Sequence, residues 1–178
     1  MGPEDDLDLD LLLEVLDSTP RRDGRATDGF ADDDVASAWL AGHDLPHGSR
    51  DVRELRRVRD LLQGVVRAEL PASALSGDLV GVRKLPVLDE SGLHWQLTGA
   101  GGTPARLVLA WAAVEQAAPG RLRPCENHDC RRFLLDRSRN NTGRWCSMEA
   151  CGNRMKARRH RERAAGRDQG APLGTPSD

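Results

Sequence analysis

Four cysteines form the clearest chemical pattern in this chain of 178 residues. They are all the cysteines it has, and they lie in one short stretch at Cys125, Cys130, Cys146 and Cys151. The spacing is two C-x4-C pairs with 15 residues between them. Zinc takes four thiolates in a tetrahedron, and two close pairs joined by a loop of hairpin length can supply them. The spacing therefore predicts one structural Zn2+ on these four sulfurs.

Three other uses of four cysteines have to be weighed against zinc. Two disulfides need an oxidising compartment, whereas the acidic start of the chain does not look like a secretory signal, so we expect a cytoplasmic protein. A redox pair is usually C-x-x-C, which is absent. An iron–sulfur cluster also takes four thiolates, and the spacing leaves it open. His128 is expected to be exposed, because four thiolates already complete a zinc shell.

A nine-residue motif, C-S-M-E-A-C-G-N-R, spans residues 146–154, and F-L-L-D at 133–136, S-R-N at 138–140 and R-W at 144–145 precede it. Together these motifs resemble the CGNR zinc finger. In that family the finger follows an N-terminal domain called ABATE, in proteins described as stress-induced transcription regulators. The resemblance implies a finger at 121–163, an ABATE-like regulatory domain at 1–120, and DNA binding. Residues 1–120 match more loosely: Asp17-Ser18 stands where the family has Asn-Thr.

Local patterns within the finger predict a treble-clef-like module. Residues 132–136 and 144–146 are expected to pair as a hairpin, with Phe133 and Trp145 as its small core. Ser147 is positioned to cap a helix that runs to Arg163. So small a module buries little apolar surface, so the metal must supply much of its folding energy.

The predicted last helix is strongly basic. Residues 121–163 carry 13 bases and 5 acids, a balance of +8, whereas residues 1–40 carry 3 bases and 12 acids, a balance of −9. A solvated helix face normally mixes signs, so this clustering indicates a nucleic-acid contact. The scarcity of aromatic residues favours double-stranded DNA over stacked single strands. The residues assigned to this contact are Arg154, Lys156, Arg158, Arg159, Arg161, Arg163, Arg139 and Arg144.

Residues 1–120 are predicted to be mainly helical, which with the finger makes an α+β fold. Apolar spacing favours helices at 7–16, 32–41 and 49–70, an extended segment at 79–98 containing a β-hairpin, and a helix that begins near Thr103. The arginines of the third helix, Arg53, Arg56, Arg57 and Arg59, are interpreted as a solvated face. The Gly/Pro-rich tail at 164–178 is predicted to be disordered.

Three classes of function remain open from the sequence. A DNA-binding transcription regulator is favoured, with a small-molecule or protein effector acting on residues 1–120. A zinc-stabilised adaptor for an acidic protein and an RNA-binding module are the alternatives. An enzyme is not expected, because common catalytic motifs are absent and a shell of four thiolates leaves no open metal position. No apolar stretch is long enough for a membrane span, so no membrane partner is expected.

Overall fold

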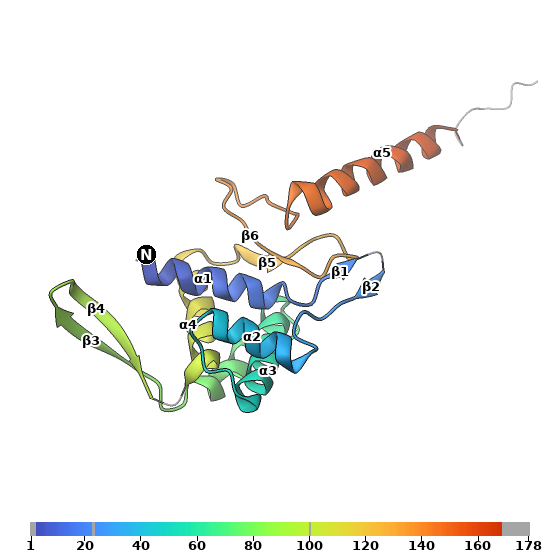
Figure 1. The fold of residues 1–178 in the computed structure, drawn as a ribbon. Coiled ribbons are helices and arrows are strands. Elements are labelled where there is room, and N and C mark those ends of the chain that lie inside the picture. Colours follow the sequence, from blue (N-terminus) through green and yellow to red (C-terminus); the bar gives the residue numbers. More distant parts are fainter. Residues whose placement is uncertain (1–2, 23, 100, 169–178) are drawn as a thin grey trace, which may run out of the picture.

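The computed structural model describes residues 3–22, 24–99 and 101–168 of the chain (Figure 1). Four helices form a body in its N-terminal part: α1 (Pro3–Leu16), α2 (Asp33–Gly42), α3 (Ser49–Val66) and α4 (Gly102–Ala117). Three antiparallel strand pairs accompany them: β1 (Arg21–Arg22) with β2 (Arg25–Ala26), β3 (Arg83–Asp89) with β4 (Gly92–Thr98), and β5 (Leu122–Pro124) with β6 (Phe133–Leu135). The remaining elements are the 3₁₀ helix η1 (Ala72–Leu79), the π-helical turn η2 (Met148–Gly152) and the last helix, α5 (Asn153–Asp168). The predicted α+β class is confirmed.

An apolar core between the four body helices holds the N-terminal part together. In α3 the buried residues Val52, Leu55, Val58 and Leu62 recur every three or four positions, which places them on one face. Leu12 of α1 is also fully buried in this core. Burying a leucine side chain contributes about 1.5–3 kcal/mol, so this core is a large favourable contribution to the folding of the body. Among the described helices, none combines the length and apolar character needed to cross a bilayer.

Helix α3 is shorter than the pattern predicted. It ends at Val66 instead of reaching Leu70, because the chain turns at Ala68, whose φ is +58°. The N–H groups of Glu69 and Leu70 then both donate to the carbonyl of Gly64. A Cβ at residue 64 would lie 2.7 Å from the Leu70 Cδ1 atom, so a larger residue there would require the Leu70 side chain to move. The predicted helices at 7–16 and 32–41 are confirmed as parts of α1 and α2.

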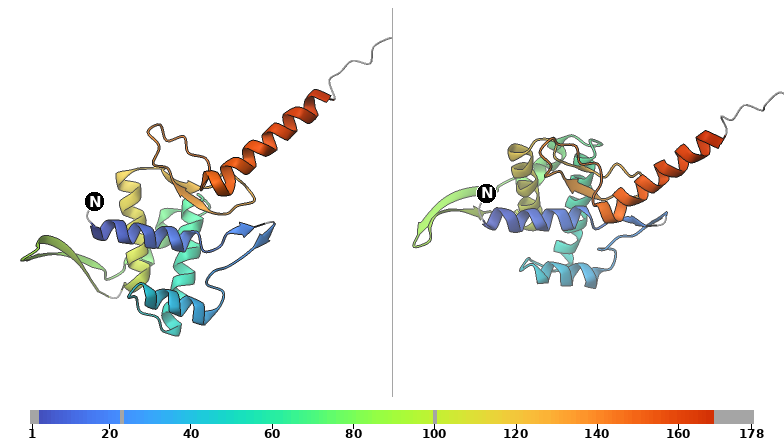
Figure 2. Two further views of the ribbon diagram at one scale, coloured as in Figure 1. Left: turned by 45° about the horizontal axis from the view of Figure 1, so that its top comes forward. Right: turned by 90° about the horizontal axis from the view of Figure 1, so that it is seen from above.

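The predicted β-hairpin within residues 79–98 is confirmed and is longer than expected. Its strands β3 and β4 pair from Arg83↔Thr98 to Asp89↔Gly92. The two views of Figure 2 show this hairpin extending away from the helical body, on the side opposite α5. The start of the expected extended segment differs, because Leu79 ends η1 and residues 80–81 form a turn before β3.

The finger's hairpin is formed by different strands from those predicted. β6 pairs with β5, which precedes the first cysteine, in the register Leu122↔Leu135 to Pro124↔Phe133. Residues 144–146 contribute only single contacts, such as the N–H of Glu126 donating to the Arg144 carbonyl at 2.9 Å. The prediction of a 132–136/144–146 hairpin was therefore wrong. The physical reason is that the first C-x4-C loop is itself the turn between β5 and β6.

The expected small core of Phe133 and Trp145 is also not what the structure shows. Phe133 and Leu122 join the apolar core of the helical body, where both are buried. Trp145 packs instead against the cysteine cluster. The two aromatic residues therefore serve different sides of the hairpin: one side attaches the finger to the body, and the other side covers the metal site.

Polar contacts at three points reinforce the attachment of the finger to the body. The N–H of Phe133 donates to the Asp17 carboxylate at 2.8 Å, and the N–H of Arg21 donates to the Cys130 carbonyl at 2.8 Å. Arg67, at the end of α3, donates from Nη2 to the Arg131 carbonyl at 3.1 Å. Burial raises the pKa of Asp17, although the Phe133 N–H and nearby Arg132 oppose this shift. The finger is thus docked on the body through loop 17–21 and the end of α3.

Helix α5 runs further than predicted. It ends at Asp168 instead of Arg163, so residues 164–168 are helical and not part of a disordered tail. Ala164 and Ala165 favour the helical backbone, and the helix continues through Gly166 although glycine disfavours it. The rest of the predicted tail, residues 169–178, lies outside the described residues.

Candidate metal centre and nucleic-acid interface

The four cysteine sulfurs form one compact cluster. All lie within 4.8 Å of one another, with Sγ–Sγ distances of 3.6 Å for Cys130–Cys146 and 3.8 Å for Cys146–Cys151. Tetrahedral zinc with Zn–S bonds of about 2.3 Å separates its sulfurs by about 3.8 Å. All four cysteines are free thiols. Donor type, number and spacing therefore fit one structural Zn2+, as predicted for Cys125, Cys130, Cys146 and Cys151.

Two turns deliver these ligands. Cys125 follows β5 and Cys130 lies shortly before β6, so both lie on the loop at the end of the finger's hairpin. Cys151 lies in η2, where Ser147 accepts the Ala150 N–H at 2.9 Å and caps the turn as predicted. The N–H groups of Cys151 and Gly152 both donate to the Ser147 carbonyl, which winds η2 wider than an α-helix. Helix α5 therefore starts directly at the metal site.

Gly152, the glycine of the C-G-N-R motif, has a packing role. A Cβ there would lie 2.5 Å from the Met148 Sδ atom and 3.2 Å from the Trp145 ring. Gly152 is buried, whereas Asn153 and Arg154 after it are exposed. Glycine thus lets η2 close against Trp145, while the next two residues of the motif face solvent.

Asn127 supports the metal site and was not recognised in the sequence. Its side chain is buried, donates from Nδ2 to the Cys151 Sγ atom at 3.3 Å, and accepts the Asp129 N–H at 3.2 Å. The Cys146 N–H also points at the Cys125 Sγ atom, at 3.4 Å. Such donors stabilise thiolates and orient them for the metal. His128, one residue on, is exposed and not among the clustered ligands, as expected.

The protonation of the thiols shows why this cluster needs a cation. Burial raises the pKa of Cys130 to about 11, and burial together with the neighbouring thiolates raises the pKa of Cys146. Burial opposes the shift at Cys151, yet hydrogen bonds from Asn127 and the other thiols lower its pKa. Four thiolates at this separation repel one another unless a metal ion neutralises them.

The loop between β6 and Cys146 is held by one buried carboxylate. Asp136 accepts N–H groups of Ser138 and Gly143 and pairs with the Arg123 guanidinium at 2.6 Å. Hydrogen bonds from Ser138 and Gly143 and the charge of Arg123 lower the pKa of Asp136 to about 2. Arg123 also donates to the carbonyls of Asn141 and Gly143. These hydrogen bonds give loop 136–143 a defined conformation, and Arg139 is exposed on this loop.

The six basic residues assigned to α5 are all exposed, and α5 extends away from the body (Figures 1 and 2). Arg158 pairs with Glu162 at 2.9 Å, and the Arg159 guanidinium lies 5.7 Å from the Trp145 ring centroid. Within the part of the chain that the structure describes, no ion pair is recorded for the other four: Arg154, Lys156, Arg161 and Arg163. The described part of α5 thus presents an exposed and predominantly basic surface.

The two other predicted contact residues lie on finger loops that precede α5 in the sequence. Arg144 is exposed, pairs with Glu126, and lies with its guanidinium 5.2 Å from the Trp145 ring centroid. Its charge is therefore partly used within the finger. Arg139 lies on the clamped loop and is exposed. Both positions belong to the finger, although neither is on α5.

Basic residues outside the predicted set also lie beside the metal site. Arg21 of β1 contacts the Cys130 carbonyl through its N–H, and Arg25 of β2 is exposed on the same hairpin. Arg131 is exposed between them and α3. In both figures the β1–β2 hairpin extends from the same side of the body as α5. The sequence carried a hint, R-R-D-G-R at 21–25, but not its proximity to the finger.

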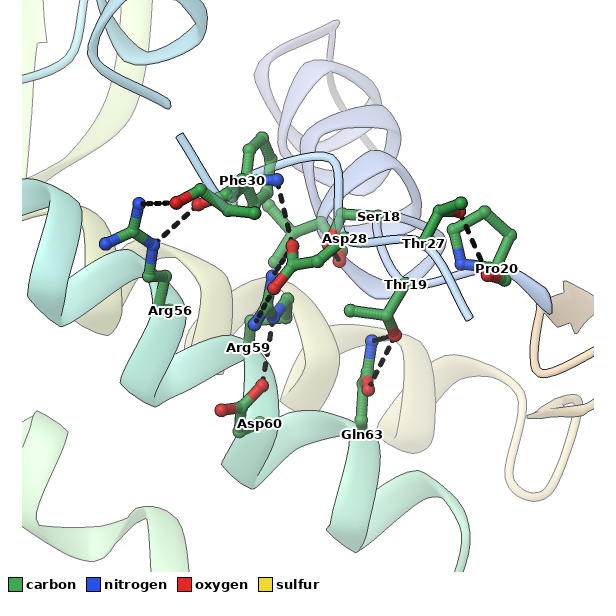
Figure 3. A network of polar contacts seen from close by, with 12 residues as sticks. Ser18, Thr19, Pro20, Thr27, Asp28, Phe30, Arg56, Arg59, Asp60 and Gln63 are labelled. Carbon is green, nitrogen blue, oxygen red and sulfur yellow. Dashed lines mark hydrogen bonds and ion pairs between the residues drawn. The ribbon is translucent and has the colours of Figure 1, made fainter. Parts of the chain in front are cut away.

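The arginines of α3 do not form the solvated face that was predicted (Figure 3). Arg59 is buried; it binds both carboxylate oxygens of Asp28, at 2.6 and 3.0 Å, and contacts Asp60 at 2.9 Å. Arg56 donates to the carbonyls of residues 30 and 31. Arg57 pairs with residues 54 and 78. Arg53 alone of the four is exposed without a recorded partner in the described residues, because residues 28–33 and η1 supply partners for the others.

Comparison with known proteins supports the zinc-finger assignment. Residues 121–164 match the family model of the CGNR zinc finger. The match covers the four cysteines, η2 and most of α5. A search of curated proteins found no match to the chain. The chain therefore contains a CGNR-type zinc-finger module with a four-cysteine zinc site.

Proposed function

We propose that this protein binds double-stranded DNA through its zinc finger and acts as a transcription regulator. The observation that carries the proposal is α5: a helix rooted in the metal site, extending from the body, with six exposed basic residues between Arg154 and Arg163. At about 1.5 Å per residue, its 16 residues extend about 24 Å. That is long enough to lie in a major groove, which is about 12 Å wide.

The charge distribution on α5 is more typical of a helix that binds a polyanion than of a helix that only contacts solvent. A helix that is polar all round gains little from packing, and like charges three and four residues apart repel. Arg154, Arg158 and Arg161 follow one another at such spacings, with Glu162 as the sole acid between residues 154 and 163. Phosphates would relieve this repulsion and release bound counterions. Arg21, Arg25 and Arg131 extend the basic surface next to the metal site.

We propose a regulatory role for residues 1–120, through a small-molecule or protein effector, and no enzymatic activity. Support comes from the docking contacts. Loop 17–21 contacts the metal-binding loop at Cys130 and Phe133, and the same loop reaches α3 through Thr19, which hydrogen-bonds Gln63 at 2.8 Å. A shift of this loop would change the surroundings of the metal site. Its test is whether candidate effectors alter DNA affinity.

The experiment for the DNA contact measures binding of the zinc-loaded chain to duplexes across a salt series. Arg154→Ala, Arg158→Ala and Arg161→Ala are compared with Arg53→Ala, an exposed arginine of α3. Losing one phosphate contact should lower the salt slope of log K by about 0.9 for every sequence. Losing a base contact should cost about 1–3 kcal/mol at one position of the site. Arg53→Ala should bind like the parent.

Two results would overturn the DNA proposal. If the three α5 variants bind duplex DNA like the parent while zinc stays bound, α5 is not the contact element. If the parent prefers RNA, or binds acidic proteins and not duplex DNA, the RNA-binding or adaptor alternative replaces it.

A further inference from the structure

The β3–β4 hairpin carries an exposed apolar face that nothing in the described chain covers. Paired residues of an antiparallel hairpin point to the same face, and neighbours along a strand alternate. The register therefore gathers five apolar residues on one face, here named the apolar hairpin face: Pro86, Leu88, Leu93, Trp95 and Leu97. Leu88 is 78% exposed, Leu93 65%, Trp95 50% and Leu97 39%. The opposite face is mixed, because it also carries polar and charged residues beside Leu85 and Val87: Arg83, Asp89, His94 and Gln96.

The base and tip of the hairpin hold this face in a defined position. At the base, a Cβ on Gly99 would lie 2.2 Å from the Gly81 carbonyl oxygen, so the two strands leave the body in close contact. At the tip, Asp89 accepts the N–H of Ser91 at 2.8 Å and its hydroxyl at 2.6 Å. The apolar hairpin face therefore has a defined position away from the helical body, with a close strand contact at its base and a hydrogen-bonded turn at its tip (Figure 2).

An exposed face of this kind is costly for a hairpin standing alone. A two-stranded sheet is marginally stable in water and normally needs a third strand or a packed apolar face. Among the described elements, β3 and β4 pack closely on each other, and Figure 1 shows them apart from the helices. A large aromatic side chain at the centre of such a patch, here Trp95, is typical of a protein interface.

We propose that the apolar hairpin face binds the same face of a second copy of this chain. The charges at its two ends argue for a second copy. Lys84 lies on this face at the base, paired with Leu97, and the exposed Glu90 lies in the turn at the tip. In an antiparallel two-fold pairing, the base of each hairpin covers the tip of the other, so each Lys84 approaches Glu90 of the second copy. A parallel pairing would place like charges together.

The area is also adequate for self-association. Five apolar side chains at these exposures present on the order of 400–500 Å2 per hairpin, as large as the biggest apolar patch of a typical monomer. Two such faces bury on the order of 1,000 Å2, the lower limit for a specific interface. The dimer should therefore be reversible and dependent on concentration. It does not depend on the proposed DNA binding.

Sedimentation velocity of the zinc-loaded chain over a concentration series tests the proposal. The parent should pass from monomer to dimer. Leu88→Glu should weaken the dimer at least tenfold, whereas Leu85→Glu, on the opposite face and 47% exposed, should not. Lys84→Glu and Glu90→Lys should each weaken the dimer, and the variant with both changes should recover it, because the exchanged charges again attract. Circular dichroism confirms that each variant is folded.

A parent chain that stays monomeric at every concentration would overturn the proposal. So would equal effects of Leu88→Glu and Leu85→Glu, since the association would then use another surface. The proposal would also be overturned if the variant with both Lys84→Glu and Glu90→Lys failed to recover the dimer. The antiparallel pairing of these charges is the argument that the partner on the apolar hairpin face is a second copy of the chain.

Discussion

The helical body and the zinc finger obtain their order from different sources. In the body, leucines and valines of four helices bury one another, and arginines such as Arg59 are neutralised by acids on neighbouring loops. In the finger, the corresponding centre is the cluster of four cysteines with Trp145 beside it. The body is stabilised mainly by burial of apolar side chains, and the finger is stabilised mainly by metal binding to its cysteine thiolates.

At their junction, the helical body and the zinc finger share core residues and hydrogen bonds, so they are not independent. Leu122 and Phe133 are finger residues by sequence, yet they belong to the body's core. Asp17 is a body residue, yet it receives a finger N–H. We therefore expect loss of the metal to melt the cysteine loops and to weaken the body without unfolding it.

The largest effect should follow from losing a ligand. Cys146→Ser removes one of four thiolates, and structural zinc supplies about 10–16 kcal/mol to small zinc-dependent folds. Hydrogen exchange should show lost protection across residues 125–152, while α1, α3 and α4 stay protected. Protection lost throughout would show that body and finger form one cooperative unit. Protection retained at 125–152 would show that the finger folds without a complete metal site.

A smaller effect, on zinc affinity, should follow from removing the hydrogen bond that Asn127 donates to a ligand sulfur. Asn127→Ala removes the donor to the Cys151 sulfur, and such outer contacts are worth about 10- to 100-fold in metal affinity. Competition with a chromogenic chelator should show this loss of zinc affinity. His128→Ala, one residue away and exposed, is the matched control and should bind zinc like the parent. Equal affinity of all three proteins would mean that Asn127 has no such role.

The smallest effect should come from the junction. Asp17→Ala leaves the buried Phe133 N–H without an acceptor, which should cost about 1–3 kcal/mol of unfolding free energy. Asp17→Asn keeps an acceptor. Burial raises the pKa of Asp17, so the stability that its neutral form provides is present below the unfolded pKa near 4 and lost as pH rises through the folded pKa.

The amide of Asp17→Asn stays neutral at every pH. This variant should therefore be at least as stable as the parent at pH 7, with the difference shrinking toward pH 4. Thermal unfolding of both variants across pH measures this. An Asp17→Asn protein as unstable as Asp17→Ala would show that the carboxylate charge, and not the acceptor, secures the junction.

The sequence predicted the parts of the site that depend on residue type and spacing. Two C-x4-C pairs predicted the four metal ligands, and the resemblance to the CGNR zinc finger favoured zinc over an iron–sulfur cluster. Apolar spacing was sufficient for α1, α2, most of α3 and the β3–β4 hairpin. The basic residues of the last helix were predicted to be exposed, and they are.

Features that depend on contacts between distant segments could not be predicted in this way. Nothing local distinguishes an arginine on a solvated face from Arg59, whose acid partner Asp28 is 31 residues away. The pairing of β6 with β5 instead of residues 144–146 depends on the body's core accepting Leu122 and Phe133. Asn127 is one polar residue among several in its loop until its amide is seen beside the Cys151 sulfur.

The central claim, that a metal on four sulfurs holds the finger and the root of α5, is tested most directly by elemental analysis of the purified chain together with native mass spectrometry. The account predicts close to one zinc per chain and four cysteines free of disulfides. Iron with a visible charge-transfer band, two disulfides, or a folded finger with no bound metal would contradict it.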